Sequence, residues 1–159
     1  MSWFVRNLRE MQWWDRGPRG SVTDLVGDDD AQVGANLFVL APGQPMSMYH
    51  WEADQEGFLV LSGEALLIVE DEERPLRQWD FFHCPPNVPH TIVGAGSGPA
   101  AILAIGGREH ATGAWGAYPY SELAIKHDAS AEEETTEPSV AYARFPARTE
   151  GEFRRDWLP

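Results

Sequence analysis

The sequence predicts an all-β protein built from antiparallel strands. Six short apolar runs, each of the length of a single strand, fill the middle of the chain. Gly, Pro and acidic turn signals separate these runs about every 10 to 15 residues, a spacing typical of sandwiches and barrels. Nothing in this region is long and periodic enough to form a helix. We therefore expect an antiparallel β-barrel or jelly roll.

Sequence composition divides the chain into three parts. Residues 1–30 form an N-terminal arm that is rich in Trp and ends in an acidic turn at Gly27–Asp30. Residues 31–107 form the barrel core, with predicted strands at 35–43, 57–63, 64–70, 79–86, 90–96 and 99–107. Residues 108–159 form a C-terminal extension that we expect to pack on the barrel or on a partner subunit.

The extension carries signals for two short helices. Ser121 is placed to cap the first, over SELAIKHD, and Pro138 suits the first turn of the second, PSVAYAR. The stretch SAEEETTE between them is polar and predicts a loop. The chain closes with Phe153, Trp157 and Leu158, which are too apolar for a free tail.

Composition excludes several classes of protein. A hydrophobic content of 43% indicates a globular chain, and no apolar run approaches the roughly 20 residues of a membrane helix. A net charge of −13 argues against nucleic acid and against anionic membranes as partners. Cys84 is the only cysteine, so no internal disulfide forms, which fits the cytoplasm. No signal peptide is evident.

Four residues in the predicted core favour a metal site. His50 and Glu52 are two apart on a strand and therefore project from the same face. Glu56 opens the next strand, and a hairpin would place it beside them. His90 begins another strand after a Pro-rich turn and can reach the same interior. Imidazoles and carboxylates both bind divalent cations, although an isolated strand histidine is more often a hydrogen-bonded core or surface residue.

The same residues lie in two motifs that resemble those of the cupin superfamily, in particular its small single-domain bacterial members. Residues 43–63 resemble the first motif: Glu56 and Gly63 match in type and spacing, Gly43 is one residue too far from His50, and Glu52 replaces a histidine. Residues 79–94 resemble the second. The matching residues there are Asp80, Pro85 and His90; Trp79 and Asn87 stand where glycines are usual, and Gly94 replaces an asparagine.

The resemblance implies one divalent transition metal held by His50, Glu56 and His90. Glu52 falls on a fourth ligand position with its residue type changed. A carboxylate there either binds, which favours Fe, Mn or Ni alongside Zn, or swings away and leaves three protein ligands. In the second case Glu52 is our first candidate for a catalytic proton carrier.

Other side chains are weaker candidates. His83 and Cys84 precede His90 on a strand, and we expect one of them to face inward. His83 is a candidate for catalysis as an acid or base, or for supporting a ligand. Cys84 is either a nucleophile or, more often in such places, a buried structural thiol. Arg108 is placed to meet an anionic substrate at the barrel mouth.

The sequence thus leads to two functional hypotheses. The first is a metal-dependent enzyme, of oxygenase, isomerase or lyase type, acting on a small organic substrate. The alternative is a non-catalytic small-molecule-binding protein with a structural metal or none. Proteins similar to this one often dimerise, so we also expect a homodimer.

Overall fold

The computed structural model describes residues 3–26, 31–110 and 114–158, and the predicted acidic turn at Gly27–Asp30 lies outside them. The described residues form one seven-stranded antiparallel sheet and one three-stranded sheet. The larger sheet has the order β12 (Thr149–Gly151), β1 (Trp13–Asp15), β2 (Ser21–Val26), β3 (Val33–Leu40), β10 (Ala100–Gly107), β5 (Glu56–Ser62) and β8 (Phe81–Cys84). The smaller has the order β7 (Glu72–Arg77), β6 (Glu64–Val69) and β9 (His90–Ala95).

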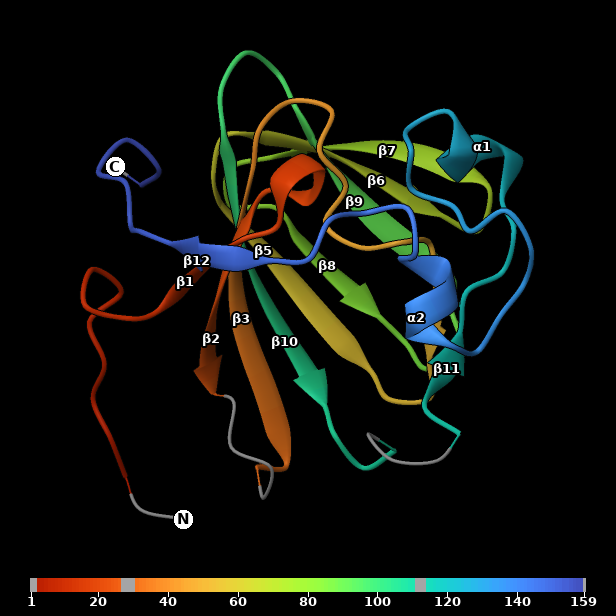
Figure 1. Cartoon of the computed structure of the whole chain (residues 1–159), viewed down its shortest axis with the longest axis horizontal. Coiled ribbons are helices and arrows are strands. Elements are labelled where there is room, and N and C mark those ends of the chain that lie inside the picture. The colour runs from red at the N-terminus through yellow and green to blue at the C-terminus, as the bar shows by residue number, and fades with distance from the viewer. Residues whose placement is uncertain (1–2, 27–30, 111–113, 159) are drawn as a thin grey trace.

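A further strand pair continues the smaller sheet. The short strands β4 (Trp51–Glu52) and β11 (Gly116–Ala117) pair with each other. Just before β4, His50 and His90 form an antiparallel bridge, with backbone N–H···O bonds of 3.1 and 2.8 Å. Figure 1 shows the two sheets one behind the other, as in a jelly roll, which confirms the predicted fold class.

The main core lies between the two sheets. Alternate residues of β3 point to opposite faces, so Leu40 faces inward while Leu37 and Val39 face outward. Both sheets contribute buried inward residues: Leu40, Phe58, Val60 and Ile102 from the larger, and Ala65, Leu67 and Ile92 from the smaller. The barrel core therefore has an apolar interior of its own.

Both ends of the chain cover the outer face of the larger sheet. Trp13 of β1 is fully buried there against Leu37, and its ring centroid lies 4.8 Å from that of Trp157. Figure 1 shows β12, near the C-terminus, beside β1. The apolar end of the chain thus packs on the barrel, over strands that the sequence did not predict.

The extension contains the two predicted short helices, α1 (Glu122–Ile125) and α2 (Pro138–Ala141). Ser121 caps α1 as expected, because its Oγ accepts a hydrogen bond of 3.1 Å from the backbone N–H of Ala124. Residues after α1 pack on the outer face of the smaller sheet. Among the described residues, no helix is long and apolar enough to span a membrane.

Candidate metal centre

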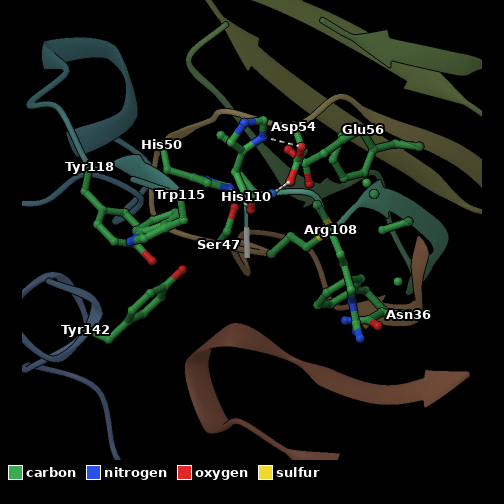
Figure 2. A pocket seen from close by; sticks show the side chains of 18 of the residues that line it. Asn36, Ser47, His50, Asp54, Glu56, Arg108, His110, Trp115, Tyr118 and Tyr142 are labelled. Carbon is green, nitrogen blue, oxygen red and sulfur yellow. Dashed lines mark hydrogen bonds and ion pairs between the residues drawn. The ribbon is translucent and has the colours of Figure 1, made fainter. Parts of the chain in front are cut away.

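A cavity of about 430 Å³ opens beside the ends of β3, β4, β5 and β10. Figure 2 shows the aromatic side chains of Trp115, Tyr118 and Tyr142 on one side of it and Arg108 on the other. These aromatic residues belong to the C-terminal extension, which therefore forms part of the cavity wall. The titratable side chains that line the cavity are Arg16, His50, Glu52, Asp54, Glu56, Arg108, His110, Tyr118 and Tyr142.

The side chains of the two predicted histidines, His50 and His90, lie close together in the candidate metal group. The Nδ1–H of His50 donates to the carbonyl oxygen of Met48 at 2.8 Å, and that of His90 donates to the carbonyl of Val88 at 3.0 Å. A carbonyl only accepts, so each backbone bond holds a proton on Nδ1 and leaves Nε2 for another partner. The ring centroids lie 5.0 Å apart, because the two residues are direct partners in the antiparallel bridge.

Glu56 completes the group from the opposite sheet. Its Oε2 lies 3.3 Å from Nε2 of His90, and one ligand atom from each of His50, Glu56 and His90 lies within 4.8 Å of the others. The predicted hairpin between His50 and Glu56 is wrong: β4 pairs with β11, whereas β5, which starts at Glu56, pairs with β10 and β8. The inward direction of the side chain, rather than strand pairing, brings Glu56 to the histidines.

The group fits a divalent metal on chemical grounds. His90 is fully buried, and its Nε2 has no hydrogen bond of normal geometry among the described residues, although Glu56 is near. A buried polar nitrogen without such a bond is unfavourable unless another group binds it. Two imidazole nitrogens and one carboxylate form a ligand set that Fe, Mn, Ni and Zn all accept.

Glu52 lies beside the group rather than in it. Its Oε1 is 3.3 Å from Nε2 of His50, which confirms that the two side chains project from the same face. The carboxylate is not among the ligand atoms that lie within 4.8 Å of one another. Its side chain is about one third exposed and lines the cavity. Of the two roles left open by the sequence, this position favours a carboxylate that lies beside a three-residue ligand group.

Cys84 and Glu56 together determine the charge of His90 in the absence of a metal. Burial alone would lower the pKa of His90, but the contact with Cys84 and the attraction of Glu56 raise the pKa to about 10. The Sγ of Cys84 lies 3.3 Å from Nδ1 of His90. At neutral pH, His90 of the metal-free protein is thus an imidazolium whose second proton faces Glu56.

His83 and Cys84 face in opposite directions on β8, as expected for adjacent strand residues. Cys84 is buried in the main core and packs behind His90, so it has the surroundings of a structural thiol. His83 is exposed and does not line the cavity. The structure does not bring His83 to the metal group.

Three features of the cavity were missed from the sequence. Arg16 comes from the segment after β1, and Tyr118 and Tyr142 come from the extension. Asp54 and His110 form a third feature, with two contacts of 2.8 Å from the backbone N–H and Nδ1 of His110. Burial would raise the pKa of Asp54, but the hydrogen bonds from His110 lower it. No local pattern signals these residues, because tertiary packing alone brings them together.

Comparison with known proteins identifies the family of the central domain. Residues 36–106 match the family model of the cupin domain, Cupin_2. This range contains all three members of the candidate metal group, His50, Glu56 and His90. No curated protein matches the chain.

Solved structures support the same fold. A cupin 2 domain-containing protein from Halorhodospira halophila aligns with 69% of this chain and 75% of its own, with a TM-score of 0.54 and 19% identity. A cupin 2 conserved barrel domain protein from Salinispora arenicola aligns with 67% of this chain and 89% of its own, with a TM-score of 0.54 and 20% identity. At these low identities, both alignments support a shared fold and carry no information about function.

A third structure is more similar in sequence. It is a protein from Acidithiobacillus ferrooxidans whose name proposes a sugar phosphate isomerase, with 28% identity and a TM-score of 0.51. The alignment covers 57% of this chain and 62% of that protein. The likeness therefore leaves out parts of both chains, including much of what surrounds the shared domain.

Proposed function

We propose that this chain, a cupin by its central domain and fold, is a metal-dependent enzyme that acts on a small organic molecule. The observation that carries the proposal is the convergence of His50, Glu56 and His90 beside a cavity of about 430 Å³. A cavity of this size accommodates a small ligand and is lined by both aromatic and charged groups, as binding sites commonly are.

The residues have distinct roles in this proposal. His50, Glu56 and His90 hold the metal, and the carbonyls of Met48 and Val88 orient the two imidazoles. When bound, a divalent metal supplies Lewis acidity and orients the substrate. Glu52, next to the group and partly exposed to the cavity, exchanges a proton with the substrate. Trp115 and Tyr118 shield the reacting end from bulk water.

The reaction class is an oxygenase, isomerase or lyase. In metal-dependent enzymes of these classes the metal binds the substrate or oxygen, and proton transfer in an isomerase or lyase needs a further group, a role that Glu52 has in this proposal. The resemblance to the protein named for a sugar phosphate isomerase favours testing isomerase substrates first. Because that alignment covers only part of each chain, its substrate is a starting point for assays.

Elemental analysis tests the proposal. Protein purified without a metal-chelating tag should contain about one transition metal per chain, or take one up on reconstitution. His90→Ala should lower the affinity on the order of 100-fold, because it removes a buried ligand. His127→Ala is the matched control, since His127 also contacts a glutamate, Glu73, but on the surface.

The outcomes separate the two hypotheses. Metal in the wild type and in His127→Ala, with loss in His90→Ala, supports the metal group, and turnover that a chelator abolishes supports the enzyme. Equal metal content in all three proteins would show that the site is wrongly placed. A wild-type protein that takes up no metal would leave the alternative, a non-catalytic small-molecule-binding cupin.

A further inference from the structure

Arg16 is a buried cation in the wall of the same cavity. Its side chain comes from the turn between β1 and the short 3₁₀ helix at Gly17–Arg19, and only 7% of its surface is exposed. Nη1 donates to the carbonyl of Met46 at 2.9 Å, and Nη2 donates to that of Arg19. The guanidinium carbon lies 4.9 Å from the centroid of the Phe38 ring, and Phe38 and Met46 also line the cavity.

No carboxylate of the described residues forms an ion pair with this cation, although the chain has 25 acidic residues and only 12 basic ones. A guanidinium has five N–H donors, and two of the five are used in the bonds to backbone carbonyls. Nε is buried and has no hydrogen-bond partner among the described residues. Arg16 therefore keeps charge and donor capacity that this part of the protein does not use.

The charged surroundings of Arg16 are mixed, and the cations among them have the larger effect: Arg19 and Arg148 disfavour its charge, whereas Tyr142 and Asp24 favour it. Burial and the charge of Arg19 lower the pKa of Arg16 to about 9, so it is still a cation at neutral pH. The guanidinium of Arg19 lies 4.4 Å from the ring centroid of Tyr142, another residue of the wall. An unpaired buried charge is unfavourable, and an anionic ligand would relieve it.

We propose that the substrate carries an acid group, a carboxylate or a phosphate, which Arg16 binds. The planar guanidinium matches either oxyanion, which can accept two hydrogen bonds from it. The cavity wall also carries the carboxylates of Glu52, Asp54 and Glu56, which repel an anion. The acid group is thus directed to Arg16, and the uncharged or metal-binding end of the substrate is directed to the histidines. This orientation rests on the proposed function, whereas anion binding by Arg16 does not.

The anion site can be tested on metal-free protein prepared with a chelator. The side-chain Nε–H resonance of Arg16 in wild-type protein is followed by NMR during titration with succinate, methyl phosphate or uncharged succinamide at constant ionic strength. The resonance is assigned by its loss in Arg16→Lys. We expect a saturable shift with one or both acids and none with succinamide. The acid that binds more tightly identifies the carboxylate or the phosphate as the natural group.

Variants test whether Arg16 itself is responsible. Arg16→Gln should weaken acid binding at least about tenfold, which corresponds to the loss of a charged hydrogen-bond partner. Arg74→Gln, which alters an exposed arginine paired with Glu72, should bind like the wild type. No saturable shift of the Arg16 resonance in wild-type protein, or equal binding by Arg16→Gln, would overturn the proposal. The wild-type titration decides the matter if Arg16→Gln does not fold.

Metal analysis of the same samples separates this proposal from the proposed function. If the protein binds acids but takes up no metal, the anion site at Arg16 is supported and the proposed metalloenzyme is refuted. If it takes up metal but binds no acid, the metal group is supported and the anion site is refuted. Arg16→Gln should keep the metal content of the wild type, because Arg16 is not among the residues of the metal group.

Discussion

The metal-free protein should lose folding stability as the pH rises from 7 to 9. The pKa of His90 is raised in the folded protein from an ordinary value of 6.5 to about 10. A raised pKa means that the folded state binds the proton more tightly than the unfolded chain does. The resulting stabilisation is fully present below pH 6.5 and is lost as the pH passes through about 10.

The structure sets the size of this effect. Between the two pKa values, the unfolded histidine has lost its proton while the folded one retains it, so stability falls by about 1.4 kcal/mol per pH unit. Over these two pH units the loss is roughly 2–3 kcal/mol, a large part of the roughly 5–15 kcal/mol typical of a domain. The full conversion applies because His90 is completely buried between Cys84 and Glu56.

Urea denaturation of chelator-treated protein at pH 7, 8 and 9 measures the slope. His90→Gln cannot take up the proton, so its stability should vary much less. The remaining slope belongs to other groups, such as exposed His110 and buried Arg16, whose pKa values also differ from their ordinary ones. His127→Gln is the matched control and should keep the wild-type slope. Constant wild-type stability across this range, or an equal slope in His90→Gln, would refute the assignment of the proton to His90.

Three other predictions concern single positions. Glu52→Gln should leave metal stoichiometry unchanged and weaken affinity by less than about tenfold, because the carboxylate lies outside the ligand group; loss of the metal in a binding titration would make Glu52 a ligand. Trp13→Ala should cost about 3–5 kcal/mol in a urea titration, since Trp13 is fully buried, and a smaller loss would show that its outer cluster contributes little. Trp79→Gly should stabilise the protein by about 0.5–1 kcal/mol, because Trp79 is 67% exposed and has a φ of 75°, a backbone conformation that is strained for any residue with a Cβ. Gly98→Ala, at an uncrowded position, is the control and should leave stability unchanged. Destabilisation by Trp79→Gly would show that the backbone at Trp79 is not strained.

The sequence predicted the strands of the central domain that have a clear apolar run, and it missed β1 and β2 in the arm and the exposed strand β7. In strand β5, buried core residues such as Phe58 and Val60 alternate with partly exposed ones, and this period of two identifies a strand. Strand β7 reads EERPLR and is almost wholly exposed, so its sequence resembles a turn. The hairpin turn before it was recognised from its acidic residues, and Glu70 and Asp71 have the positive φ values of 46° and 64° that such a turn needs.

Two of the three departures from the second cupin motif have a structural explanation. Trp79 and Asn87 stand where glycines are usual, and both have positive φ, 75° and 66°. The backbone therefore keeps the left-handed conformation that glycine adopts easily, and other residues carry it at some cost. Motif spacing survived the substitutions because backbone geometry, rather than residue type, places His90.

Motif spacing also accounts for what could not be predicted about the site. His50, Glu56 and His90 belong to the central domain, so a family pattern of one segment contains them all. Arg16 belongs to the N-terminal arm, and Tyr118 and Tyr142 belong to the extension; they meet the domain only in the folded chain. No local pattern relates residues so far apart in sequence.

The cavity wall combines the candidate metal group of the central domain with residues of the arm and the extension. A fragment of residues 31–107 would retain the three metal-binding side chains and would lose Arg16, Trp115, Tyr118 and Tyr142 from the wall. The candidate metal group therefore lies entirely in the central domain, and the same domain can serve different substrates. If the proposals above hold, the arm and the extension select the substrate, so relatives that also have an arginine at the position of Arg16 and the aromatic wall are the informative ones. A cupin with the same metal group but without that arginine should not discriminate acids from their uncharged amides.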